Sequence, residues 1–178
     1  MTAVGGPRRE RAAGTPFALL RRMPELRLAG LAFVVELLWE LLQSPFYADT
    51  FTEAPATVLW YRVHCTGGDV LILLGAWGVA ALVARSRRWY RTPSPPALAA
   101  FVLVGVAYTA FSEWRAVYVT HGWDYAPTMP TLGGIGVVPL VQWVLLPPLL
   151  LVLMRRWEAP RRRSPAAGTP RSDGPRRR

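Results

Sequence analysis

The hydrophobic residues of this chain are gathered in four long blocks, and shorter segments rich in proline and polar residues separate them. A membrane-spanning helix needs about 20 mostly apolar residues, a length that each block reaches. The blocks predict transmembrane helices at residues 26–46, 63–84, 97–118 and 132–154. We therefore expect an all-α integral membrane protein with four transmembrane helices, whose membrane domain covers residues 25–156.

The arginines indicate how this domain is oriented. The 21 basic residues are all arginine. All but Arg62 and Arg115 lie before or at the very start of the first predicted span, between the second and third, or after the fourth. Loops rich in arginine stay in the cytoplasm, and an even number of spans puts these three segments on one side. Both termini are therefore expected to be cytoplasmic, in a multi-pass protein of the cell (inner, or plasma) membrane.

The two ends of the chain differ from the membrane domain. Residues 1–24 are basic, lack the apolar core of a secretory signal peptide, and are expected to be disordered or interfacial. Residues 157–178 are rich in arginine and proline, which predicts a disordered tail.

The absence of lysine beside abundant alanine, glycine and proline is typical of a GC-rich bacterial genome. A net charge of +10 would suggest that the protein binds nucleic acid. However, the arginines lie mostly between or beyond the apolar blocks, as in membrane proteins, so we do not expect nucleic acid as a partner.

Polar residues inside the predicted spans are the anomaly of the sequence. Glu36 and Glu40 share one face of the first span with Gln43 and Tyr47. Carboxylates within a bilayer are costly and tend to mark functional sites. These side chains therefore require protonation, partners on neighbouring helices, or both.

The other three spans carry polar residues too. His64 and Asp69 lie in the second span, Glu113 in the third and Gln142 in the fourth. Because successive helices alternate in direction, all these residues fall in the outer half of the membrane or near its middle. They predict one pocket that opens toward the outer leaflet or extracytoplasmic water. The candidate catalytic residues are Glu36, Glu40, His64, Asp69 and Glu113. The candidate substrate-binding residues are Trp39, Gln43, Arg115, Gln142 and Trp143.

Small residues along the second span indicate helix packing. Gly67 and Gly68 are expected to allow close backbone approach, and the four-residue spacing of Ala76, Ala80 and Ala84 suits a tight helix interface. The fourth span contains Pro139, Pro147 and Pro148, and interior prolines predict a kinked helix.

Five motifs carry a resemblance to a family. They are ELLWELLQSPFY at 36–47, HCTGGD at 64–69, SEW at 112–114, WDYAPTMP at 123–130 and GIGVVPLVQWVLLPP at 134–148. Over roughly residues 26–154 the chain resembles an uncharacterised family of small bacterial four-helix integral membrane proteins. That resemblance implies the fold and topology but no activity. His121 and Gly122 followed by a proline-bearing final helix are also similar to the sterol-isomerase/emopamil-binding group, a likeness from which no residue role is transferred.

Three functions remain open from the sequence. In the first, the protein binds or acts on a lipid or other apolar substrate, with the carboxylates as general acids and bases and His64 as a proton shuttle. Alternatively, it is a transport or proton-relay component that works as a homo-oligomer. A third alternative is an accessory subunit of a membrane complex in which the polar residues pair structurally.

Metal and redox cofactors are not expected. The carboxylates could hold a metal together with His64 or His121, but the Glu-x-x-His helical pair of di-iron bundles is missing. Both histidines lie on outer segments, a placement that disfavours haem. The single cysteine, Cys65, excludes an internal disulfide bond.

Overall fold

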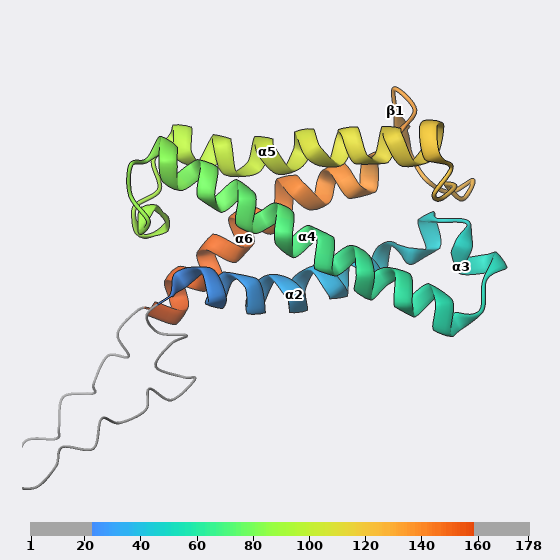
Figure 1. Ribbon diagram of the computed structural model, residues 1–178, viewed down its shortest axis with the longest axis horizontal. Coiled ribbons are helices and arrows are strands. Elements are labelled where there is room, and N and C mark those ends of the chain that lie inside the picture. The colour runs from blue at the N-terminus through green and yellow to red at the C-terminus, as the bar shows by residue number, and fades with distance from the viewer. Residues whose placement is uncertain (1–22, 159–178) are drawn as a thin grey trace, which may run out of the picture.

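A computed structural model describes residues 23–158, which form a bundle of four long helices with short elements at their ends (Figure 1). The long helices are α2 (Pro24–Gln43), α4 (Pro55–Val83), α5 (Pro95–Trp114) and α6 (Val137–Glu158). The predictions for the N-terminal segment and the C-terminal tail lie outside the described residues, except at their inner edges. There α6 continues helically through Glu158.

Proline sets the start of three of these helices. Pro24, Pro55 and Pro95 stand at their first positions, where the fixed φ of proline suits a helix and its missing N–H costs nothing. Helix α4 consequently begins at Pro55 rather than near Val63, so Arg62 lies on the helix instead of in a connection.

The helices end in irregular elements. The π-helix η3 (Arg115–Thr120) extends α5 and stops at His121, whose φ of 50° is left-handed. A small hairpin of β1 (Thr131–Leu132) and β2 (Ile135–Gly136) precedes α6, and its turn uses Gly133 and Gly134 at positive φ. The fourth helix therefore starts at Val137, later than the predicted 132. After α2 come the short helices η1 (Ser44–Phe46) and α3 (Asp49–Thr52), and η2 (Trp89–Arg91) links α4 to α5.

Three segments are long and apolar enough to cross a membrane, namely Pro55–Val83, Pro95–Thr120 and Val137–Glu158. Helix α2 has 20 residues, a length of roughly 30 Å. It carries Glu25, Arg27, Glu36 and Glu40, more ionisable side chains than a purely lipid-facing helix tolerates. The expectation of a membrane protein is thus met by three of the four predicted spans on length and composition.

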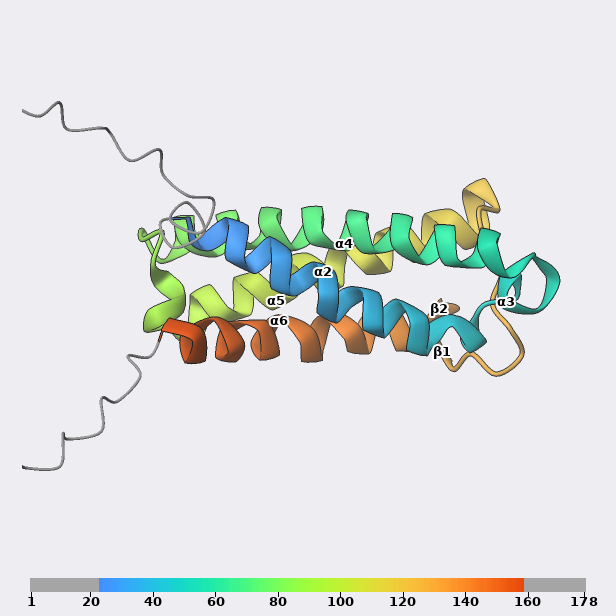
Figure 2. The ribbon, with the colours of Figure 1, turned by 90° about the horizontal axis from the view of Figure 1, so that it is seen from below.

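The helices form a ring in which α2 packs on α4 and α6, and α5 packs on the same two helices (Figure 2). Within residues 23–158 the arginines separate into two groups along the bundle. Arg62 and Arg115 lie toward one end. We call the opposite end the arginine end, and it holds Arg27, Arg85, Arg87, Arg88, Arg91, Arg155 and Arg156.

Each helix buries one stripe, and the stripe changes character halfway along the bundle. Buried positions recur every three or four residues, the period that keeps side chains on one helical face. Toward the arginine end these positions are apolar, and toward the other end they are polar. The stripe of α2 is Leu28, Ala32, Glu36, Glu40 and Gln43, and that of α5 is Ala97, Phe101, Gly105, Thr109 and Glu113.

Aromatic rings fill the bundle at the arginine end. The centroid of the Trp77 ring lies 5.1 Å from those of Trp89 and Tyr90 and 6.2 Å from that of Phe101. Beside them, the Glu158 carboxylate accepts hydrogen bonds from Arg27, Arg91 and the Tyr90 hydroxyl, tying α2, η2 and α6 together. Burial raises the pKa of Tyr90, which keeps its hydroxyl protonated as a donor.

Close helix approach occurs at Gly105, not at the glycines predicted to allow it. A methyl group added at Gly105 would overlap the Trp143 ring of α6, whereas one added at Gly67 or Gly68 would meet nothing within 4 Å. The expectation for Gly67 and Gly68 was wrong because they lie off the buried face of α4, where Thr66 and Leu73 are buried.

Candidate functional site

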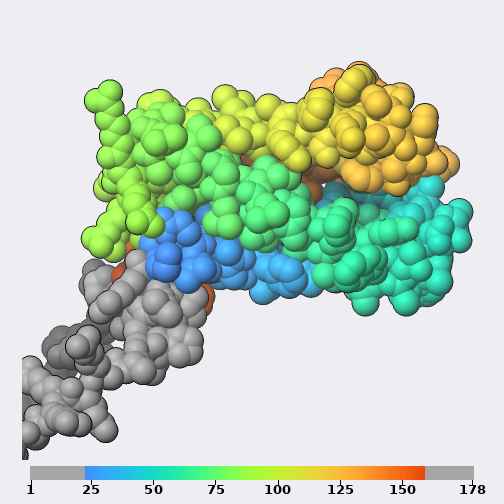
Figure 3. Space-filling view, viewed as in Figure 1, coloured from blue at the N-terminus to red at the C-terminus, as the bar shows by residue number. Residues whose placement is uncertain are grey.

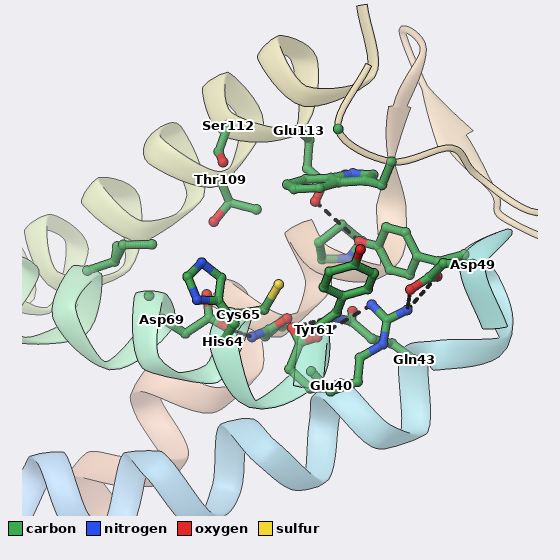
Figure 4. A pocket seen from close by; sticks show the side chains of 18 of the residues that line it. Glu40, Gln43, Asp49, Tyr61, His64, Cys65, Asp69, Thr109, Ser112 and Glu113 are labelled. Carbon is green, nitrogen blue, oxygen red and sulfur yellow. Dashed lines mark hydrogen bonds and ion pairs between the residues drawn. The ribbon is translucent and has the colours of Figure 1, made fainter. Parts of the chain in front are cut away.

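Between the polar halves of the four helices lies a cavity of about 530 Å³ (Figure 4). We call this end of the bundle the cavity end. Volumes of 300–1,000 Å³ are usual for small-molecule sites. Side chains from all four long helices, from the segment after α2 and from the loop after η3 contribute to its lining.

Gln142 of α6 forms the floor of the cavity. Its Nε2 donates to Glu36 Oε2 at 2.7 Å and to Asp69 Oδ2 at 3.1 Å, so one amide group joins α2, α4 and α6. An amide nitrogen has two protons, and these two bonds use both. Asp69 and Gln142 line the cavity, and Glu36 is buried behind them.

A second group of polar side chains forms the wall on α2. Gln43 Nε2 donates to Glu40 Oε1 at 2.6 Å, and Trp39 Nε1 donates to Gln43 Oε1 at 3.0 Å. The spacings of three and four residues are those at which side chains meet on a helix. Glu40 and Gln43 line the cavity, whereas Trp39 acts through its bond to Gln43.

Arg62 is buried in the cavity wall. Its Nη2 lies 2.6 Å from both carboxylate oxygens of Asp49, and its Nη1 lies 3.9 Å from Glu40 Oε2. The guanidinium carbon also stands 5.1 Å from the centroid of the Tyr47 ring. Arg62 was not predicted as a site residue, although its spacing with Thr66 and Asp69 places all three near one face of a helix.

Glu113 of α5 is held from the opposite wall. It accepts hydrogen bonds from the Tyr47 hydroxyl at 3.2 Å, the Tyr125 hydroxyl at 2.7 Å and the Trp123 indole at 3.4 Å. Burial, reinforced by Glu113, raises the pKa of Tyr47 and of Tyr125, so both phenols remain donors. Neither Trp123 nor Tyr125 was among the candidate site residues predicted from the sequence.

The segment after α2 and the loop after η3 join across the cavity end. The Ala48 N–H donates to the Asp124 carbonyl at 3.0 Å and the Ala126 N–H to the Phe46 carbonyl at 2.9 Å. Tyr47 and Tyr125 form the antiparallel bridge between these two bonds. This pairing fixes the two tyrosines that donate to Glu113.

Two predicted residues lie apart from this network. Arg115 is exposed on η3 and does not line the cavity. His64 lines it but is exposed, with its ring 6.4 Å from that of Trp60. Trp143 lies at the floor beside Gly105. In the described part of the chain, no three His, Cys, Asp or Glu side chains come together as metal ligands.

The lining is strongly acidic. It contains one arginine, Arg62, and one histidine, His64, against five carboxyl side chains, namely Glu40, Asp49, Glu53, Asp69 and Glu113. Arg62 is already paired with Asp49. Buried carboxylates are retained only when they are protonated, hydrogen-bonded or matched by positive charge. The cavity is therefore suited to accept hydrogen bonds or to hold a cation.

Comparisons with known proteins add no assignment to this geometry. No protein-family model, curated protein or solved structure matches the chain. The function is therefore argued from the cavity.

Proposed function

We propose that this protein is a four-span protein of the bacterial inner membrane that binds one amphiphilic molecule in the cavity. Both termini would lie in the cytoplasm with the arginine end, and the cavity in the outer half of the bilayer. In this arrangement α2 crosses the membrane together with the three apolar helices α4, α5 and α6. Its polar residues face Gln142 and Arg62, and it presents Phe33, Val34 and Leu38 outward as a lipid-contacting surface.

The observation that carries this proposal is the acidic and aromatic lining of a cavity of about 530 Å³. Tyr61, Tyr108 and Trp143 provide apolar surface, and the carboxylates exceed the available cations. A ligand with an apolar body and a polar group that donates hydrogen bonds or carries positive charge would match both features. Aromatic faces near a bound cation add cation–π attraction.

Other functions receive less support from the structure. A proton relay across the monomer would need polar groups along the whole bundle, but the network ends at Glu36 and aromatic packing follows it. Purely structural pairing of the polar residues would not require a space of this volume between them. General acid–base chemistry on the bound molecule is compatible with Asp69 and Glu113 in the lining.

Binding of matched amphiphiles tests the proposal. The protein in zwitterionic nanodiscs is titrated with dodecylamine, dodecanol and dodecanoate, and saturable one-to-one binding is read by native mass spectrometry and tryptophan fluorescence. We expect dodecylamine to bind at least tenfold more tightly than dodecanoate. Asp69→Asn should weaken dodecylamine binding about tenfold, the effect of losing roughly 1.4 kcal/mol.

Glu25→Gln is the matched control, because Glu25 pairs with Arg87 at the arginine end and should leave binding unchanged. Equal affinity for the three probes would contradict the proposal. So would unchanged binding in a folded Asp69→Asn protein, judged folded by its thermal midpoint.

A further inference from the structure

Most sides of the cavity are closed by named contacts. Gln142 bonded to Glu36 closes the side between α2 and α6, and Arg62 near Glu40 closes that between α2 and α4. Trp143 packed on Gly105 closes the side between α5 and α6. The backbone pairing of Phe46–Ala48 with Asp124–Ala126 links the segments at the cavity end.

The side between α4 and α5 differs from these because its aromatic contact, between Trp77 and Phe101, lies near the arginine end and not beside the cavity. Within residues 23–158 no side-chain hydrogen bond or ion pair joins these two helices. They pack together near the arginine end and diverge toward the cavity end (Figure 1). The space-filling view shows a hollow on the surface between them (Figure 3). Thr109 and Ser112 of α5 face His64 and Cys65 of α4 across an open space (Figure 4).

The residues along this opening belong to the cavity lining and are exposed or half-buried. On α4 they are His64 and Gly68, and on α5 Tyr108 is exposed and Ser112 half-buried. Gly68 has no side chain to narrow the gap, and a methyl group placed there would meet nothing within 4 Å. We call this opening the lateral slot.

We propose that the ligand enters the cavity sideways from the outer leaflet, through the lateral slot, and leaves its apolar chain lying between α4 and α5. This inference rests on the proposed function, because it specifies how an amphiphile would reach Asp69. The slot faces lipid when the helices span the bilayer, so a molecule dissolved in the membrane reaches the floor without crossing water. The ligand class is then a single-chain amphiphile whose polar group turns inward to Asp69 and Gln142.

The competing route is from water at the cavity end, where Glu53 and Gly122 also line the cavity and are exposed. A ligand using that route would be a water-soluble cation without an apolar chain. The two routes are blocked by substitutions at different glycines, so they can be separated.

Cys65 provides the readout. It is the single cysteine of the chain and lines the cavity behind the slot. The protein in nanodiscs is alkylated with a lipid-dissolved probe, N-dodecylmaleimide, or with a sulfonated maleimide confined to water, and the labelled fraction is followed by mass spectrometry. Gly68→Trp narrows the slot, Gly122→Trp narrows the water route, and Gly78→Trp is the control, because Gly78 is an exposed α4 position outside the lining.

We expect Gly68→Trp to slow alkylation by N-dodecylmaleimide at least fivefold while changing the sulfonated probe less than twofold. Gly122→Trp should have the opposite selectivity, and Gly78→Trp should change neither rate. Ser112→Trp, which narrows the slot from α5, repeats the test if Gly68→Trp does not fold. Rates are compared only among variants with equal thermal midpoints.

An unchanged rate for N-dodecylmaleimide in folded Gly68→Trp and Ser112→Trp proteins would overturn the lateral slot. Equal slowing by Gly122→Trp or by Gly78→Trp would overturn it as well. Alkylation requires no ligand, so the slot can be verified even if dodecylamine fails to bind. Conversely, tight dodecylamine binding with an unaffected lipid probe would retain the proposed function and exclude this route.

Discussion

At the arginine end, Trp77, Trp89, Tyr90 and Phe101 pack ring against ring and fill the space between the helices. At the cavity end, the continuations of the same buried stripes leave about 530 Å³ among hydrogen-bonded polar side chains. Apolar rings gain dispersion contacts only by touching, so they close a space. Pairs such as Glu40 with Gln43 satisfy each other within one wall and do not draw the opposite walls together. The difference shows how one bundle can be anchored at one end and hollow at the other.

The largest loss of stability should come from truncating a buried ring of the aromatic cluster at the arginine end. Trp77→Ala removes a buried ring, and such truncations cost about 3–5 kcal/mol of unfolding free energy. Denaturant unfolding in detergent micelles, followed by circular dichroism, measures the loss. Trp60→Ala is the control, since Trp60 is 64% exposed and should cost less than about 1 kcal/mol. Similar losses for the two variants would mean that the aromatic cluster does not anchor the bundle.

A slightly smaller loss of unfolding free energy should follow from removing Arg62, the cation of the cavity wall. Arg62→Met leaves Asp49 and Glu40 without their cation, and removing one partner of a buried pair costs roughly 3 kcal/mol. Adding Asp49→Asn to that variant should restore part of the stability, because it removes the unpaired charge. The same unfolding assay measures both proteins. If the double variant is no more stable than Arg62→Met, the pair with Asp49 is not the source of the loss.

The polar network shows where prediction from sequence succeeds and where it stops. Helical spacing correctly placed Glu40, Gln43, Asp69, Glu113 and Gln142 around one cavity, because the alternation of helix direction brings the polar half of each stripe to the same end. Arg62 was missed because hydropathy placed the start of α4 near Val63, whereas Pro55 determines it. Hydropathy detects the lipid-facing part of a helix and not its full hydrogen-bonded length.

The partners of Glu113 were beyond prediction for a different reason. Tyr47 and Tyr125 donate to it only because two irregular segments pair through backbone hydrogen bonds far apart in the sequence. Such pairing leaves no periodic signal. The glycines show the same limit, because composition marks Gly68 and Gly105 alike, and only the orientation of each helix decides which one packs on a neighbour.

The contrast between packed and unpacked glycines gives the smallest predicted change in stability. It also tests where the packed arginine end of the bundle gives way to the hollow cavity end. Gly105→Ala pushes a methyl group into the Trp143 ring and should cost about 1–3 kcal/mol of unfolding free energy, as overpacking does. Gly75→Ala adds the same methyl group where nothing lies within 4 Å, and should instead stabilise α4 by about 0.5–1 kcal/mol through helix propensity. Because Trp143 also lies at the cavity floor, Gly105→Ala should weaken dodecylamine binding, whereas Gly75→Ala should not. Unfolding and binding measured on the same two proteins check this pairing. If Gly105→Ala lowers stability and weakens binding while Gly75→Ala raises stability and leaves binding unchanged, the boundary between the two ends lies at Trp143. Equal changes in the two variants would contradict the tight contact between α5 and α6 there.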